Sequence, residues 1–202
     1  MSTGAAKRLT VDEFLVFEEA SDTRHEYFDG EIFAMAGGTA AHSLVAANAT
    51  AALVNALKGK NCRVYSADLM VFTPTGLRTY PDASITCERP RFEGDRERVL
   101  LNPQVIVEVL SESTEAYDRG RKFDNYRTMP SLREYVLVAQ DRAHVDHFAR
   151  RDDDRWVLTS YQDLSDQVEL PVLASAFAMA DLYSGVDFPT PDPPPRSDPQ
   201  EP

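Results

Sequence analysis

The sequence lacks several features that would place it in common functional classes. Two cysteines, Cys62 and Cys87, among 202 residues are too few for a disulfide scaffold or a four-cysteine zinc site. No stretch approaches the roughly 18 uninterrupted apolar residues that a membrane span needs. The amino terminus has no apolar core of a secretory signal, and no glycine-rich phosphate loop of either common type is present. These absences predict a cytoplasmic protein that makes no use of a membrane.

Positive charge is also scarce. The chain has 21 Lys and Arg against 33 Asp and Glu, which gives a net charge of −12. A protein whose main task is to hold duplex nucleic acid usually carries a basic surface, because phosphate neutralisation drives that affinity. The basic residues gather locally, between Arg119 and Arg133 and again between Arg142 and Arg151. Any contact with a polyanion must therefore be local, assisted by a metal or shared with a partner.

What is present suits one folded domain. The hydrophobic fraction of 43% and the charged fraction of 27% are ordinary for a globular protein, and the length is ordinary for one domain with its own core. Residues 187–202 hold more than half of the chain's 13 prolines and almost nothing apolar. This composition predicts a domain over residues 1–186 and a disordered, proline-rich tail over residues 187–202.

Local signals predict an amino-terminal helix and hairpin followed by a long helix. Thr10 is a plausible N-cap before an apolar-periodic stretch, and Glu13 stands at the capping-box position. Asp29-Gly30 lies between two strand-like halves, which is a strong hairpin signal. The Ala-rich residues 40–57 have helical periodicity.

The rest of the chain predicts a mixed sheet with helices packed against it. The order of elements is α/β in class, without the regular alternation of a doubly wound nucleotide-binding fold. The nearly continuous apolar run at residues 104–110 fits a central strand that is covered on both faces. The expected strands are residues 62–66, 69–72, 83–87, 104–110, 134–138, 145–148 and 156–161, and the expected helices are residues 118–129 and 174–182.

Two acidic residues stand in unusual surroundings. Glu108 lies within the apolar run, where a carboxylate is costly unless it is paired, hydrogen-bonded or bound to a metal. A partner arginine or a strand end near water would explain Glu108 equally well. Asp82 follows a proline at the start of a second apolar stretch, and Pro-Asp alone is only a turn signal. Carboxylates from two adjacent strands can, however, converge on one hard divalent cation.

Lys122 and Tyr126 belong to the helix expected after the Glu108 strand. A lysine on a helix is normally a solvated charge, and Asp118 stands four residues earlier as an ion-pair partner. The functional alternative is that the Lys122 ammonium points over the strand ends towards a reacting phosphate. Tyr126, four residues further on, shares that face and could support the lysine.

These residues lie in segments that resemble a known family. The segments PDASITCE (81–88), VIVEVLSEST (105–114) and DRGRKFDNYRTMPSLREYVLV (118–138) are similar to the Uma2 family of restriction endonucleases, within the PD-(D/E)XK nuclease superfamily. Upstream, RHEYFDGEIFAMAGG (24–38) and AAHSLVAAN (40–48) resemble the opening of that family. The resemblance extends over about residues 10–150, which is most of the chain.

The resemblance implies a restriction-endonuclease-like core, with a mixed sheet of four or more strands flanked by helices. Asp82 matches the aspartate of the superfamily motif and Glu108 its second acidic residue, and both would be metal ligands and catalytic residues. Two positions after Glu108, where the superfamily usually has lysine, this chain has Leu110. The resemblance implies that in this family the lysine has moved to the following helix, which makes Lys122 the third catalytic candidate.

Two upstream residues are supporting candidates. An amino-terminal glutamate often supports the metal in this superfamily, and we prefer Glu26 to Glu31 for that role. Both glutamates lie beside the Asp29-Gly30 turn, where a solvent-facing charge is equally consistent. His42, near the start of the Ala-rich helix, could contact substrate or carry a proton, although a histidine there more often caps or packs.

The expected function is a Mg²⁺-dependent endonuclease, with Mn²⁺ as the alternative ion, that hydrolyses phosphodiester bonds of nucleic acid, most simply DNA. Two other classes stay open. The acidic charge and Leu110 favour a catalytically inactive nuclease-fold module for assembly or nucleic-acid binding, and the acidic surface would also suit a hydrolase of small phosphodiesters. A homodimer is reasonable, since cutting two strands needs two sites.

Overall fold

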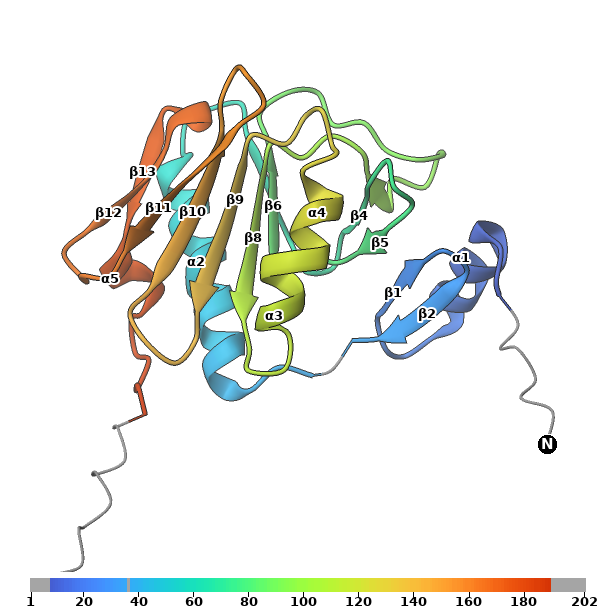
Figure 1. Ribbon diagram of the computed structural model, residues 1–202, viewed down its shortest axis with the longest axis horizontal. Coiled ribbons are helices and arrows are strands. Elements are labelled where there is room, and N and C mark those ends of the chain that lie inside the picture. The colour runs from blue at the N-terminus through green and yellow to red at the C-terminus, as the bar shows by residue number, and fades with distance from the viewer. Residues whose placement is uncertain (1–7, 36, 190–202) are drawn as a thin grey trace, which may run out of the picture.

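The computed structural model describes residues 8–35 and 37–189, and Figure 1 shows its arrangement. The body of the fold is a six-stranded mixed sheet in which β8 and β9 are parallel and the other neighbours are antiparallel. In sheet order its strands are β11 (Trp156–Tyr161), β10 (Val145–Arg150), β9 (Glu134–Ala139), β8 (Val105–Leu110), β6 (Ala83–Thr86) and β3 (Arg63–Ser66). The predicted α/β class and mixed sheet are confirmed.

The two central strands are buried along their whole length, as the apolar run at residues 104–110 predicted. On one face of β8 and β9 lies the helix α2 (Ala40–Ala56), whose Val45 and Leu53 pack with valines of the two strands. On the other face, Tyr126 and Met129 pack with Tyr135 of β9. Alternating side chains of each central strand therefore enter two separate cores, and a polar group on either strand has no route to bulk water except at a strand end.

A helical segment with three parts covers the second face (Figure 1). It consists of α3 (Glu115–Tyr117), a π-helical turn η1 (Asp118–Lys122) and α4 (Phe123–Tyr126). The expected helix over residues 118–129 is confirmed in type, but it begins three residues earlier and ends three residues earlier. The sequence signal for its end, Pro130, lies beyond the turn that follows Tyr126.

A second sheet of five strands carries the amino-terminal hairpin. Its order is β2 (Glu31–Ala34), β1 (His25–Phe28), β5 (Arg78–Thr79), β4 (Met70–Phe72) and β7 (Val99–Leu100). Asp29 and Gly30 both have positive φ, at 49° and 86°, as the two central residues of a type I′ hairpin require. Figure 1 shows this hairpin and α1 (Val11–Ala20) at one side of the main sheet. The Thr10–Glu13 capping box that begins α1 is also confirmed.

The expected closing helix over residues 174–182 is largely wrong. Residues 175–178 form the strand β13 (Ser175–Ala178), which pairs with β12 (Gln167–Leu170), and only α5 (Met179–Leu182) is helical. The alanines of this stretch favour a helix, but four backbone pairings with β12 outweigh that weak preference. The strands β5, β7 and β12 were not predicted, since the first two have only two residues each.

The two cysteines form one disulfide rather than a scaffold. Cys62 and Cys87 flank the paired ends of β3 and β6, where Arg63 lies opposite Thr86, and their Cα atoms are 3.9 Å apart. In the part of the chain that the structure describes, no helix has the length and apolarity to cross a membrane. Of the expected tail, residues 190–202 lie outside the described residues, whereas the Phe188 ring packs against Tyr183 at 5.2 Å.

Candidate active site

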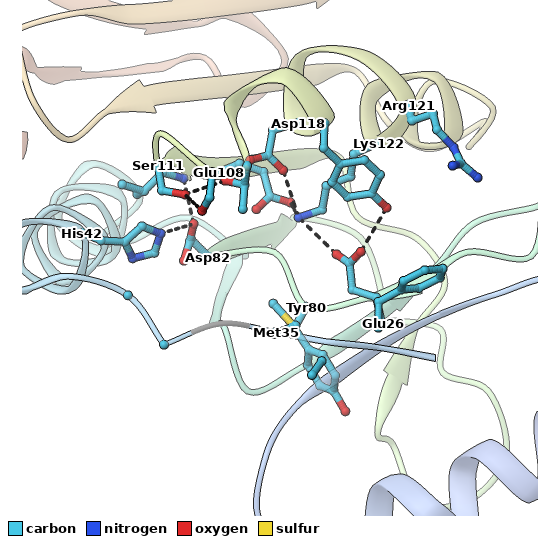
Figure 2. Close-up of a pocket in the computed structure, with 18 of the residues that line it drawn as sticks. Glu26, Met35, His42, Tyr80, Asp82, Glu108, Ser111, Asp118, Arg121 and Lys122 are labelled. Atoms are coloured by element: carbon cyan, nitrogen blue, oxygen red, sulfur yellow. Dashed lines mark hydrogen bonds and ion pairs between the residues drawn. The ribbon is translucent and has the colours of Figure 1, made fainter. Parts of the chain in front are cut away.

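A pocket of about 610 Å³ opens where the hairpin, the start of α2 and the α3–η1–α4 segment meet the end of β8. It gathers residues that are far apart in the sequence. Figure 2 shows most of the predicted site residues pointing into this space from different elements. Five of the six predicted site residues line the pocket, and the sixth lies directly behind one of them; the five are Glu26, His42, Asp82, Glu108 and Lys122.

Lys122 is the centre of the site (Figure 2). Its ammonium Nζ lies 2.8 Å from Glu108 Oε1, 3.3 Å from Asp118 Oδ1 and 3.4 Å from Glu26 Oε1. The residue is only 4% exposed, so the interpretation of Lys122 as a solvated surface charge is wrong. The proposed ion-pair contact with Asp118 does exist, but it is buried. One cation therefore holds three carboxylates together beneath the pocket.

Glu108 is fixed from two sides. It lies near the carboxyl end of β8, is 3% exposed, and accepts a 2.8 Å hydrogen bond from the Tyr126 hydroxyl on the same Oε1 that faces Lys122. The costly carboxylate in an apolar strand is thus explained by a lysine and a tyrosine, not by an arginine. Tyr126 is fully buried behind Glu108, as expected of a supporting residue.

Asp82 lies beside Glu108 because their strands are neighbours. Ala83, the first residue of β6, pairs with Val107 of β8, which brings the preceding aspartate to the end of the Glu108 strand. Asp82 Oδ2 accepts a 2.7 Å hydrogen bond from the Val109 amide and lies 3.6 Å from His42 Nε2. The two carboxylates of the predicted motif therefore converge at one edge of the sheet.

Glu26 reaches the site from the hairpin. On β1, its carboxylate accepts a short hydrogen bond from Thr79 Oγ1 and a 3.0 Å bond from the Tyr117 hydroxyl, and it faces Lys122. Glu26 is buried, whereas Glu31, the other glutamate considered, is exposed on β2. The solvent-facing alternative is therefore wrong for Glu26. Its partner Tyr117 and the buried Asp118 are functional candidates that the sequence did not reveal.

Burial, together with an excess of negative charge, shifts the pKa values of the site residues. Burial raises the pKa of Glu108 to about 8; Lys122 opposes this shift, while Asp118 and Asp82 add to it. Burial likewise raises the pKa of Asp82, against the opposing effects of His42 and of the Val109 amide. Burial disfavours the charge on Lys122, but Glu108, Glu26 and Asp118 outweigh it and raise the pKa of the lysine. The site therefore favours added positive charge.

The donor set fits a hard cation that keeps several waters. Within residues 8–35 and 37–189, no group of three or more His, Cys, Asp and Glu side chains is arranged to hold a metal ion. Asp82 and Glu108 nevertheless supply carboxylate oxygens from adjacent strands at the pocket, and Mg²⁺ is commonly held by one or two carboxylates together with water and substrate phosphate. These two residues therefore fit Mg²⁺ in donor type and number. They do not form a complete protein cage.

The fold is shared with a solved structure that is described as a nuclease. The fold matches a solved structure from Anabaena variabilis ATCC 29413, described as "a putative nuclease belonging to DUF820", with a TM-score of 0.72. The match covers 88% of this chain and 99% of that one at 19% sequence identity.

Sequence comparison places the chain in a family. Residues 11–181 match the model of Uma2, described as "Putative restriction endonuclease", and the chain belongs to this family. Two relatives come from Synechocystis sp.. "Uncharacterized protein slr1290" is 39% identical, and the match covers 90% of this chain and 94% of that protein. "Uncharacterized protein sll1609" is 31% identical, and the match covers 84% of this chain and 96% of that protein. The predicted family and nuclease-like fold are thus confirmed.

Proposed function

We propose that the protein is a Mg²⁺-dependent endonuclease that hydrolyses phosphodiester bonds of nucleic acid, most simply DNA. The observation that carries the proposal is the convergence of Asp82, Glu108 and Lys122 at one pocket, although each comes from a different element. The displaced lysine, expected from Leu110 at the usual position, has its ammonium 2.8 Å from the Glu108 carboxylate. Leu110 itself packs in the core on the face of the sheet that the α3–η1–α4 segment covers.

Each side chain has a distinct role in this proposal. Asp82 and Glu108 would hold the cation, Asp82 from a position fixed by the Val109 amide and Glu108 from one fixed by Tyr126. A bound divalent cation polarises a phosphate oxygen and lowers the pKa of its water. Lys122 would stabilise the negative charge that grows on the phosphate, in a site shielded from water where such stabilisation is strong. Glu26 positions Lys122.

A second candidate is a hydrolase of small phosphodiesters. The site is a pocket of about 610 Å³, a size that suits a small ligand, and a net charge of −12 disfavours a broad electrostatic contact with long DNA. Both candidates use the same side chains. A gel assay on plasmid DNA, run beside hydrolysis of a small chromogenic phosphodiester, separates them by which substrate is cleaved.

The test of the proposed function is metal binding and cleavage by Asp82→Ala and Glu108→Ala. We expect calorimetry to show Mg²⁺ and Mn²⁺ binding by the wild type that both variants lose, and we expect both to lose Mg²⁺-dependent cleavage. Asp141→Ala is the matched control, because Asp141 is an exposed carboxylate outside the pocket. Full cleavage activity in either site variant would refute the proposal. Absence of both binding and cleavage in the wild type would favour a catalytically inactive module.

Two further parts of the proposal concern assembly and location. A homodimer suits an enzyme that cuts both strands of a duplex, since two cuts need two sites, and light scattering during cleavage tests it. We also propose a cytoplasmic location. A disulfide is uncommon in that compartment unless it is transient, so the redox state of the Cys62–Cys87 pair in freshly lysed cells is an informative check.

A further inference from the structure

The pocket has two kinds of wall. Its inner end carries the charged residues around Lys122, whereas the hairpin side presents Phe28, Phe33 and Met35. An apolar wall next to buried charges has no use in binding a bare phosphate or a metal ion. It indicates a ligand that joins a flat apolar part to a charged one.

The pairing of β1 with β2 fixes the position of Phe33. Phe33 lies directly opposite Glu26 in the antiparallel register, so the two side chains share one face of the hairpin. Glu26 contacts Lys122 through that same face. The aromatic ring is therefore held next to the catalytic cluster by backbone pairing and does not depend on a loop.

Phe33 is also unusually open for a large apolar side chain that lines a pocket. It is 47% exposed, and every residue of β2 is exposed. The neighbouring Ile32 is 36% exposed, but it pairs with Tyr27 on the opposite face and is not part of the pocket lining. Two adjacent residues of one strand thus offer a test position and an internal control.

A cation completes the wall. The Arg121 guanidinium lies 5.5 Å from the centre of the Phe28 ring, is exposed, and lines the pocket. An exposed arginine beside aromatic rings suits a phosphate that is attached to a planar base, since the guanidinium binds phosphate while the rings stack on the base.

We propose that the substrate is nucleic acid with unpaired nucleotides, and that one unpaired base stacks on Phe33 while the adjoining phosphate lies over the Asp82–Glu108–Lys122 site. The inference rests on the proposed nuclease function and specifies its substrate class. In a duplex the base faces are stacked inside the helix, so no base face is available to stack on the apolar hairpin wall. Single strands, ends, loops and flipped bases expose the faces that aromatic side chains bind.

The scarcity of positive charge agrees with this substrate class. Duplex binding depends on many phosphate contacts from a basic surface, and the net charge of this chain is −12. Stacking does not depend on net charge. A local aromatic wall with one exposed arginine can therefore select an unpaired nucleotide on a protein that is otherwise acidic.

The test compares a short fluorescein-labelled DNA single strand with the same strand annealed to its complement. Binding of each to the full chain is measured by fluorescence anisotropy, with Ca²⁺ in place of Mg²⁺, and cleavage of each is measured with Mg²⁺. We expect the single strand to bind more tightly and to be cut faster. Phe33→Ala should weaken single-strand binding by about five- to a hundred-fold, the loss that removal of one base–aromatic stack produces.

Matched variants separate stacking from damage to the hairpin. Phe33→Trp keeps an aromatic face and should bind the single strand at least as well as wild type, and Ile32→Ala should leave binding unchanged. Equal or tighter binding of the duplex, or an unaltered affinity in Phe33→Ala, would overturn the substrate assignment while leaving Mg²⁺-dependent cleavage intact. Failure to cut either DNA would instead overturn the proposed nuclease function, and this inference with it.

Discussion

Two clusters of charged side chains use the same helical segment and differ in their balance of charge. The cluster around Lys122 has three carboxylates for one ammonium and lies beneath the pocket. In the other cluster, Asp146 accepts hydrogen bonds from Arg119, Ser160 and His144. A second carboxylate there, Glu115, pairs with Arg119 and Arg142, so the cluster has two carboxylates for two guanidinium groups. None of these six residues lines the pocket.

The pKa values of Glu108 and Asp146, one carboxyl group from each cluster, are shifted in opposite directions. Burial raises the pKa of Glu108 to about 8, since one shared lysine does not compensate it. Burial also opposes ionisation of Asp146, but its hydrogen bonds outweigh that effect and lower its pKa. The Asp146 cluster, in which the Asp146 carboxylate is fully hydrogen-bonded, stabilises the fold. The Lys122 cluster has more carboxylates than cations beside the pocket, so binding of a further positive charge is favoured there. Under the proposed function, this contrast fits a catalytic role for the Lys122 cluster and a structural role for the Asp146 cluster.

The largest expected effect follows from replacing Lys122, whose ammonium contacts all three carboxylates of its cluster. Lys122→Met should lower kcat for DNA cleavage by about 100- to 1,000-fold, the cost of removing one preorganised charge-stabilising group, with metal affinity retained. Single-turnover cleavage and calorimetry measure the two quantities. Since the change also leaves buried carboxylates unpaired, Lys122→Arg serves as a second variant that keeps the charge. Wild-type turnover in both variants would refute the role of Lys122.

The next effect is a dependence of stability on pH. The ordinary pKa of a glutamate is about 4.3, and that of Glu108 in the folded state is about 8. The folded state therefore binds a proton that the unfolded state releases, and this contribution is complete below about pH 4.3 and is lost as the pH rises through about 8. Urea unfolding in the presence of EDTA should show the free energy of unfolding falling over that window, by on the order of a few kcal/mol.

Glu108→Gln provides the control for this pH dependence. Glutamine cannot titrate, but its amide oxygen can still accept the hydrogen bond from Tyr126. We expect the decline between those pH values to be largely absent in the variant. An equal decline in both proteins would assign it to other groups.

The smallest expected effect comes from the Asp146 cluster, and its dependence on pH runs in the opposite direction to that of Glu108. Asp146→Asn should lower stability by about 1.5–3 kcal/mol at neutral pH, the range for hydrogen bonds to a charged group, and leave DNA cleavage at the wild-type level. Because the pKa of Asp146 is lowered, its contribution is present above the ordinary value of about 3.9 and disappears as the pH falls through the lower folded value. A marked loss of cleavage with unchanged stability would reverse the roles assigned to the two clusters.

The candidate site residues that could be found from the sequence are mainly polar residues in unusual apolar surroundings. Glu108 stands out because a carboxylate interrupts an otherwise apolar strand. Asp82 alone is only a turn signal, and it became a candidate through its combination with Glu108 and through the family resemblance. Lys122 needed the family resemblance as well, since a lysine on a helix with Asp118 four residues before it looks like an ordinary surface pair. The structure shows that pair to be buried.

Other features depend on contacts between distant segments, which no local pattern encodes. Glu26 enters the site because β1 pairs with β5 of the second sheet, which places Thr79 beside it. Tyr117 reaches Glu26 across 91 positions of sequence. The strand β13 was taken for a helix because its alanines have helical propensity, while pairing with β12 depends on a segment that carried no clear strand signal. Propensity is a weak prior wherever tertiary pairing competes with it.

The π-helical turn at Asp118–Lys122 sets the rotational phase of the helix that follows it. Each residue of a regular α-helix advances about 100° around the axis, so the one extra residue of a π turn re-aims every later side chain. In the phase that the structure shows, both Lys122 and Tyr126 contact Oε1 of Glu108. Lys122 thus approaches Glu108 from a helical segment, while Leu110, two positions after Glu108 on the strand, packs in the core.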